Sequence, residues 1–280
     1  MFPFFIISTL QVLLLVSSCE TNPGYKKQMH QINKTENREP ENIKAIPLPE
    51  GFKHIHGTDS LFADWLLSQL LRKEKSVYLY NGSRKQDQHA QFAVLGIDIG
   101  KKNLVQCADA VIKLRACFLF QYGRTTQINF RSTTGTTLSF SQWQQGWRWK
   151  EQNGQLVRLA GTNHFSMSLQ SFESFMDLVY AYCGTHSLSR QLHPLTGDIQ
   201  PGDVFVQGGF PGHAVIVISV AENSVGRKIF MLAQGFMPAQ DIHILKNPGN
   251  AELSPWYNTE EIYPLITPQW KFNEGSLMRW

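Results

Sequence analysis

The sequence predicts an α+β fold in which helices come first and a small antiparallel sheet follows. Apolar residues recur at helical spacing over 103–121 and 168–183. The last third changes period: short β-branched and apolar runs over 203–233 are separated by glycine- and asparagine-rich turns. Helices followed by strands, rather than alternating with them, are typical of α+β proteins.

The composition is that of a globular protein. Of the 280 residues, 42% are hydrophobic and 17% are charged, and the formal net charge is only +4. No run of Lys and Arg is long enough for a nucleic-acid footprint, so we expect no nucleic-acid partner. No unit of 20 to 50 residues repeats, which excludes solenoids and propellers.

The N-terminus has the pattern of a signal peptide. Residues 2–16 are mostly apolar, and this run is shorter than the ~20 residues that a membrane-spanning helix needs. The run ends in Val-Ser-Ser-Cys at 16–19, which resembles the signal of bacterial lipoproteins, where cleavage leaves a lipidated cysteine. We therefore expect a signal peptide over 1–18, lipidation of Cys19 and a membrane partner held through the lipid. An ordinary secretory signal and an uncleaved anchor are the alternatives.

Residues 19–45 are polar and predict a flexible tether, because such a segment buries too little surface to offset the entropy lost on ordering. A single α+β domain is expected over 46–280. Since Glu20 and the tether follow the lipidated cysteine, we expect the protein in the bacterial cell envelope, anchored to the outer membrane.

The expected elements follow from local patterns. Asp59 or Ser60 caps a helix that runs to about residue 73. The segment 135–149 has no clear period and is expected to be a loop, and the chain after Gly235 is not assigned. The expected strands are 76–80, 91–95, 203–207, 214–220 and 228–233, and the expected later helices are 103–121 and 168–183.

The cysteine count predicts a free thiol. Once Cys19 is lipidated, Cys107, Cys117 and Cys183 remain, and three cysteines cannot all pair in an oxidising compartment. Cys107 and Cys117 lie on one helix about 15 Å apart, too far for a disulfide. A bridge from Cys183 to Cys117, a bridge from Cys183 to Cys107, and no bridge all remain open.

Three residues predict a cysteine hydrolase. Cys107 lies in the opening turn of its helix, where free backbone N–H groups and the helix dipole favour the thiolate and lower the pKa. His213 begins a strand after the glycine-rich segment 208–212, which allows close approach to the imidazole. If the next hairpin closes around Asn223 and Ser224, Gln234 directly faces His213 and its amide oxygen holds the ring.

The same residues carry a resemblance to a known group of enzymes. Gln-Cys-Ala-Asp at 106–109, Gly-Asp-Val-Phe at 202–205 and His-Ala-Val-Ile-Val at 213–217 resemble the NlpC-type cysteine peptidases of the papain-like superfamily. This resemblance implies a helix-borne cysteine packed on a small antiparallel sheet and cleavage of peptide crosslinks in bacterial cell wall. It also implies Cys107 as nucleophile, His213 as base and Gln234 as the orienting residue.

A closer resemblance covers the whole segment from 46 to 280. The motifs at 106–110, 208–213, 237–243 and 254–257 are similar to those of a family of uncharacterised bacterial lipoproteins. The biochemical function of that family is not known, so the expectation of catalysis rests on the wider superfamily.

Further residues are expected around the nucleophile. Asp109 is expected either to bind substrate or to form an i,i+4 ion pair with Lys113. The other expected substrate contacts are Gly209, Phe210, Gly212 and Trp143. The bland alternative is that Cys107 is an inert buried cysteine and His213 a structural histidine.

A second function class is a glycan- or cell-wall-binding lipoprotein without catalysis. In that interpretation tryptophans serve as stacking platforms for peptidoglycan or surface glycan. No CxxC or HExxH pattern occurs, and His54 and His56 alone do not make a site, so no metal and no cofactor are expected. The sequence does not indicate an oligomeric state. The candidate stacking residues are Trp143, Trp147, Trp149 and Tyr122.

Overall fold

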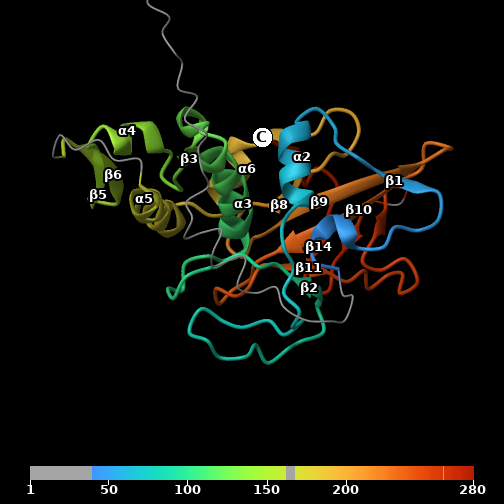
Figure 1. The fold of residues 1–280 in the computed structure, drawn as a ribbon. Coiled ribbons are helices and arrows are strands. Elements are labelled where there is room, and N and C mark those ends of the chain that lie inside the picture. Colours follow the sequence, from blue (N-terminus) through green and yellow to red (C-terminus); the bar gives the residue numbers. More distant parts are fainter. Residues whose placement is uncertain (1–39, 162–167, 261) are drawn as a thin grey trace, which may run out of the picture. The chain divides into compact units, whose positions relative to one another are not determined.

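The computed structural model describes residues 40–161, 168–260 and 262–280 (Figure 1). The expected signal peptide, the lipidation site at Cys19 and the tether up to residue 39 lie outside the described residues. Structural statements below concern the described part of the chain.

The fold is mixed α+β, with a large sheet that is mostly antiparallel. Nine strands form this sheet, seven of them in the order β2-β11-β10-β9-β8-β15-β7, while β1 pairs with β9 and β12 pairs with β10. The strands of the large sheet are β1 (Phe52–Ile55), β2 (Gln91–Val94), β7 (His193–Pro194), β8 (Val204–Gln207), β9 (His213–Asn223), β10 (Lys228–Gln234), β11 (His243–Leu245), β12 (Tyr257–Asn258) and β15 (Leu277–Arg279).

Three two-stranded sheets and several helices complete the described part. The small sheets pair β3 (Asn129–Arg131) with β4 (Thr137–Ser139), β5 (Arg148–Gln152) with β6 (Gln155–Leu159), and β13 (Leu265–Ile266) with β14 (Lys271–Phe272). The helices are η1 (Ile43–Ala45), α2 (Ser60–Leu67), α3 (Cys107–Gln121), η2 (Thr125–Gln127), α4 (Phe140–Gln144), α5 (Leu169–Tyr182) and α6 (Thr185–Gln191).

Helices cover one face of the sheet. Helices α2 and α3 contact β9, and α6 contacts β8 (Figure 1). Successive side chains of β9 point to opposite faces of the sheet and belong to two different cores. Ala214, Ile216 and Ile218 belong to the core on the helix side, whereas Val215 and Val217 belong to a second core.

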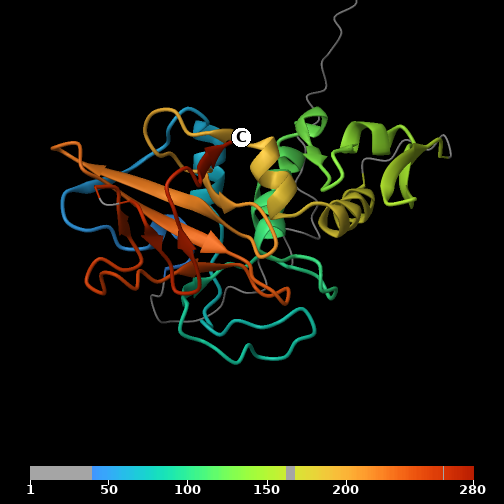
Figure 2. The ribbon, with the colours of Figure 1, turned by 180° about the vertical axis from the view of Figure 1, so that it is seen from behind.

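The C-terminal segments cover the opposite face. The second core contains Val215 and Val217 of β9 together with Phe205, Phe230 and Phe272. The view from behind shows the red C-terminal segments against the orange strands β9 and β10 (Figure 2). The unassigned chain after Gly235 therefore supplies side chains, Phe272 among them, that pack on this face of the sheet.

The predicted helices and most of the predicted strands occur where the sequence places them, including the short strand β2 at the predicted segment 91–95. Helix α5 and strands β8, β9 and β10 match the predicted segments within a few residues. Asp59 is the N-cap of α2, where its side chain accepts a hydrogen bond from the backbone N–H of Phe62. The helix ends at Leu67 rather than near residue 73, because Leu71 turns away to bridge with Leu95.

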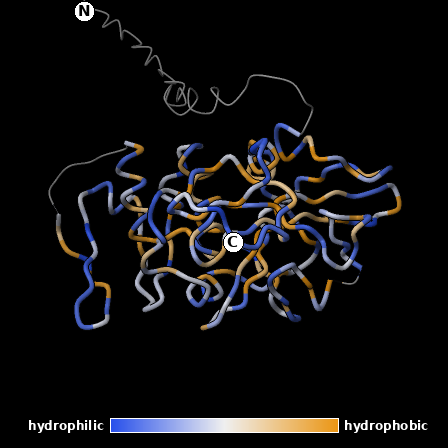
Figure 3. Tube along the Cα trace, turned by 90° about the horizontal axis from the view of Figure 1, so that it is seen from below, coloured by the Kyte–Doolittle hydropathy of each residue, from blue (hydrophilic) through white to orange (hydrophobic). Residues whose placement is uncertain are grey.

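Two local predictions are wrong. The predicted strand 76–80 forms only single bridges, from Tyr78 to Arg84 and from Leu79 to Gln240. The predicted loop 135–149 contains β4, α4 and the start of β5, which are too short to show a period. The β5–β6 hairpin projects at the edge of the described part and is mostly hydrophilic (Figure 3).

A hydrophobic helix of membrane-spanning length does not occur in the described part of the chain.

Candidate active site

The candidate nucleophile stands at the first residue of α3. Cys107 follows the N-cap Gln106, whose backbone N–H donates to Asp109 Oδ2 at 3.0 Å. The thiol is partly buried and is contacted by the backbone N–H groups of Ala108 and Ala214. Because Ala214 directly follows His213, the start of α3 lies against the start of β9.

A glycine allows this close approach. A Cβ atom added at Gly235, directly after β10, would lie 2.7 Å from the backbone oxygen of Gln106 and 3.0 Å from the Cβ of Ala110. The start of α3 therefore packs on the end of β10 with no room for a side chain. This contact brings the helix start with Cys107 to the end of the sheet that holds His213 and Gln234.

His213 and Gln234 form a buried hydrogen bond. The Nε2 atom of His213 lies 2.8 Å from Gln234 Oε1, and the two residues are 2% and 0% exposed. Aromatic rings surround the imidazole, with centroid distances of 5.1 Å to Phe236, 5.2 Å to Trp270 and 5.8 Å to Phe272. Gln234 thus accepts from the ring N–H in a site largely closed to water.

The strand register differs from the predicted one. Leu232 pairs with Val217 and Ala233 pairs with Ile216, and a bulge lies between Met231 and Leu232. Carried one residue further, this register puts Gln234 opposite residue 215 rather than opposite His213. The two side chains meet diagonally across the strands, which long side chains can do.

The electrostatics favour a neutral pair. Burial raises the pKa of the Cys107 thiol; backbone hydrogen bonds from Ala108 and Ala214 lower it, and the charge of Asp109 raises it further. Burial also lowers the pKa of His213 to about 4, against a raising effect of its bond to Gln234. The prediction of a lowered thiol pKa is wrong, because desolvation outweighs the helix start.

No hydrogen bond joins the Cys107 thiol to the imidazole in the described structure. The link between Cys107 and His213 runs through the backbone of Ala214. These pKa shifts favour a neutral thiol at Cys107 and a neutral imidazole at His213 at neutral pH.

Asp109 is a buried helix cap. Its carboxyl group is 5% exposed, and its Oδ1 atom has no hydrogen-bond partner among the described residues. Burial raises its pKa to about 8, against the effect of the hydrogen bond from Gln106. The predicted ion pair with Lys113 does not form, because the Lys113 ammonium lies 5.9 Å from the centroid of the Tyr180 ring instead.

The glycine-rich segment packs on the start of α6. A Cβ atom at Gly212 would collide with Thr185 Oγ1 and would lie 2.6 Å from the backbone oxygen of Gly209. The Thr185 hydroxyl donates to that same oxygen at 3.2 Å. Phe210 is 87% exposed, and its ring lies 6.5 Å from that of His186. Gly212 is needed for this packing, whereas Gly209 is needed for its backbone conformation at φ +137°. Phe210 is exposed on the segment just before His213.

The structure does not bring Trp143 to the Cys107–His213 region. Its indole N–H donates to Ser171 Oγ at 3.1 Å, and the Arg148 guanidinium lies 3.8 Å from its ring centroid. The other candidate stacking residues are also engaged within the protein. Arg158 lies 4.3 Å from the Trp147 ring, Trp149 is buried, and Tyr122 packs on Phe118 at 5.0 Å.

Sequence reasoning missed the side chains that bind the amide nitrogen of Gln234. Its Nε2 atom lies 2.8 Å from Gln269 Oε1 and 3.3 Å from His243 Nε2. Lys85 Nζ lies 3.2 Å from the same Gln269 oxygen. His243 falls in the motif 237–243, which is the only signal that could have indicated it.

The cysteines are free thiols. Cys107, Cys117 and Cys183 form no disulfide in the structure, which leaves the unbridged alternative. Within the described ranges, no group of three or more His, Cys, Asp or Glu residues is arranged to hold a metal ion.

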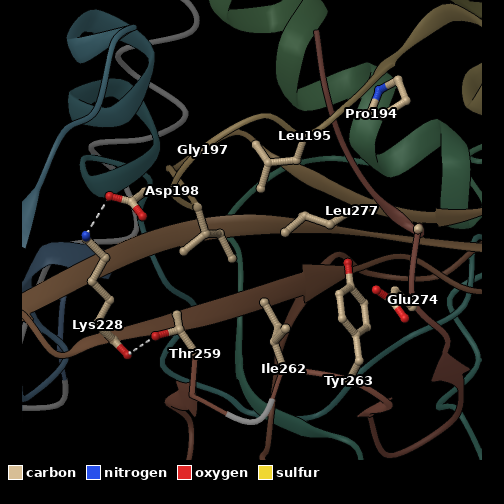
Figure 4. A pocket seen from close by; sticks show the side chains of 12 residues that line it. Pro194, Leu195, Gly197, Asp198, Lys228, Thr259, Ile262, Tyr263, Glu274 and Leu277 are labelled. Carbon is tan, nitrogen blue, oxygen red and sulfur yellow. Dashed lines mark hydrogen bonds and ion pairs between the residues drawn. The ribbon is translucent and has the colours of Figure 1, made fainter.

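An open pocket of about 440 Å³ lies apart from this region (Figure 4). Its wall is apolar at Leu195, Ile262 and Leu277, and Lys228 Nζ forms an ion pair with Asp198 at 2.8 Å on its rim. Neither Cys107, His213 nor Gln234 lines it.

Fold and site together define an α+β protein in which a helix-start cysteine and a buried His–Gln pair occupy one end of an antiparallel sheet. The chain belongs to the family described as domain of unknown function 4846 (DUF4846), whose model matches residues 43–279. Neither a curated protein nor a solved structure matches the chain.

Proposed function

We propose that this protein is a cysteine hydrolase of the NlpC-type, papain-like kind, with Cys107 as nucleophile, His213 as base and Gln234 as the residue that orients the imidazole. The observation that carries the proposal is the buried 2.8 Å hydrogen bond between His213 and Gln234, at the start of the strand whose Ala214 backbone N–H contacts the Cys107 thiol. A cysteine, a histidine and a third residue that fixes the imidazole are the components of this catalysis.

The hydrogen bond selects the tautomer of the base. An amide oxygen only accepts, so the Nε2 atom of a neutral His213 carries the proton and Nδ1 keeps its lone pair. Burial keeps the His213 imidazole neutral and able to accept a proton, because it lowers the pKa to about 4. The same shift makes the resting imidazole a weaker base than an ordinary histidine.

The reaction then has two halves. In the first, His213 takes the thiol proton, the Cys107 sulfur attacks the amide carbonyl, and the imidazolium gives the proton to the leaving amine, which leaves a thioester on Cys107. In the second, His213 removes a proton from water, the resulting hydroxide attacks the thioester carbonyl, and the proton returns to the thiolate. In this proposal, backbone N–H groups at the start of α3 stabilise the oxyanion.

The proposed substrate is an amide bond in cell-wall peptide or a related cell-envelope molecule. This part rests on the lipoprotein-like segment at 16–19, which implies lipidation of Cys19 and attachment to the outer membrane, and on the likeness to cell-wall peptidases. The non-catalytic alternative, a lipoprotein that only binds glycan or cell wall, predicts binding without turnover.

The test uses the secreted chain with Cys19→Ser and purified peptidoglycan, with released peptides identified by mass spectrometry. Cys107→Ala and His213→Ala should each abolish release and combine non-additively, whereas Gln234→Ala should retain more activity. Cys117→Ala is the matched control, because Cys117 lies on the same helix ten residues further on. If the wild-type chain and Cys107→Ala bind cell-wall fragments equally and neither releases peptide, the protein is a binding module and the proposal is refuted.

A further inference from the structure

The side chain of Gln234 is the centre of a branched hydrogen-bond network. Its Oε1 atom lies 2.8 Å from His213 Nε2. Its Nε2 atom lies 2.8 Å from Gln269 Oε1 and 3.3 Å from His243 Nε2. The two ends of a glutamine amide have nearly the same shape, so only the partners decide which end is oxygen.

His243 can bind only the NH₂ end of the Gln234 amide. Its Nδ1 atom lies 2.9 Å from the backbone oxygen of Asp241, which only accepts, so Nδ1 carries a proton. His243 is fully buried, and burial lowers its pKa to about 4, so the ring is neutral and its Nε2 atom is an acceptor. Gln234 must therefore present its NH₂ group on this side.

Gln269 requires the same orientation of the Gln234 amide, for a separate reason. Its Oε1 atom lies 3.2 Å from Lys85 Nζ, and a lysine ammonium only donates. The oxygen of Gln269 thus faces Lys85 and Gln234 together, and again Gln234 must donate. Two separate acceptors fix one orientation of Gln234, which leaves its oxygen for His213.

We propose that Gln269, held by Lys85, and His243 are positioning residues that set the orientation of the Gln234 amide and, through it, the nitrogen of His213 that carries the proton. Lys85 and Gln234 both donate to the Gln269 oxygen, and His213 donates to the Gln234 oxygen, so His213 keeps its lone pair on Nδ1. A role of this network in catalysis rests on the proposed function. The orientation of Gln234 and His213 by the network does not.

The test is the ¹⁵N and ¹H NMR spectrum of the His213 ring in the full chain with Cys19→Ser, at about pH 8, with signals assigned by comparison with His213→Ala. The wild-type chain should show one neutral tautomer with the proton on Nε2, protected from exchange with water. Gln269→Met removes one of the two acceptors at similar size, and the protection should be reduced. Gln269→Glu keeps an acceptor between Lys85 and Gln234 and should restore it.

The matched control is Gln121→Met. Gln121 also accepts a side-chain hydrogen bond, at 2.7 Å from Trp65 Nε1, but it lies at the last residue of α3, fourteen positions after Cys107. This variant should leave the His213 signals unchanged. The combined Gln269→Met and His243→Phe chain, which lacks both acceptors, should show both tautomers of His213.

The outcomes separate the two proposals. If Gln269→Met and the double variant keep the wild-type tautomer and protection while folded, the positioning proposal is overturned whatever the activity. If the NMR changes occur as expected but no variant, wild type included, hydrolyses cell-wall peptide, the positioning proposal stands and the proposed function fails. If both hold, kcat should fall in Gln269→Met and recover in Gln269→Glu, with KM little changed.

Discussion

The position of the candidate nucleophile Cys107 depends on the close contact between Gly235 and the start of α3. Gly235→Ala places a methyl group 2.7 Å from the backbone oxygen of Gln106 and 3.0 Å from Ala110 Cβ. Carbon–oxygen contacts normally lie at about 3.3 Å or more, so the start of α3 must move away from β10 by roughly 0.6 Å. Neither neighbour is the end of a flexible side chain, because one is backbone and the other a Cβ.

The expected effect is destabilisation together with a displaced thiol. Overpacking of this kind costs about 1–3 kcal/mol of the free energy of unfolding. Replacing glycine by alanine also restricts the unfolded chain, which stabilises by about 0.4–1 kcal/mol. Gly249→Ala cancels this second effect as a control, because its Cβ would meet only Asn247 Oδ1, at an ordinary 3.5 Å, and Gly249 has no positive φ.

The assay is urea denaturation of Gly235→Ala and Gly249→Ala, followed by the rate of alkylation of Cys107 in the folded state. Gly235→Ala should be less stable than Gly249→Ala by more than about 1 kcal/mol, and its Cys107 should react faster than in wild type, because the thiol loses part of its burial. Equal stability of the two variants with an unchanged alkylation rate would refute the close packing of α3 on β10.

Three further predictions follow from buried polar groups. Arg279 donates to both carboxylate oxygens of Asp203, at 2.6 and 2.8 Å, and Asp203 is 1% exposed. Arg279→Met should therefore destabilise by about 3–5 kcal/mol in urea denaturation, with a smaller loss in Arg279→Lys. Because burial raises the pKa of Asp109 to about 8, its contribution to stability is complete below about pH 4 and is lost as the pH rises through 8. Asp109→Asn should thus be more stable than wild type at pH 9, with the difference shrinking by pH 5; a constant difference in thermal unfolding would contradict this. Finally, Cys107 should be alkylated before the more buried Cys183 in the native chain, as measured by mass spectrometry. No disulfide should be found in the native or the denatured chain. Labelling of Cys183 first would contradict the structure.

The sequence predicted the fold class and its strongest elements because these carry a period. Helix α5, with 14 residues, and strands β9 and β10, with 11 and 7, are long and regular enough to be seen in one pass along the chain. Short elements such as α4, with five residues, and β4, with three, have no period to detect. They are held by tertiary contacts instead, as Phe140 is by Phe172 and Phe175.

The candidate site was predictable in its main residues but not in its geometry. Cys107 and His213 stand at the starts of regular elements, which the local pattern shows. The register between β9 and β10 was missed, because the bulge at Met231–Leu232 leaves no sign in an apolar run. The thiol pKa was missed for a similar reason, since the burial that raises it comes from packing against other elements.

The role of Gln269 could not be predicted from the sequence. It stands 35 positions after Gln234 in a segment without a recognisable pattern, and only the return of the C-terminal chain across the sheet brings the two together. The same holds for Trp270 and Phe272, which enclose the imidazole of His213.

The place of β15 in the sheet has a consequence for how the protein is made. Residues 277–279 lie between β8 and β7, with Leu277 paired to Phe205 and Arg279 paired to His193. While synthesis proceeds from the N-terminus, β8 and β7 remain unjoined until these late residues have left the ribosome. We therefore expect nascent chains stopped near residue 270 to remain sensitive to protease, and the whole domain to become resistant in one step after residue 279 emerges.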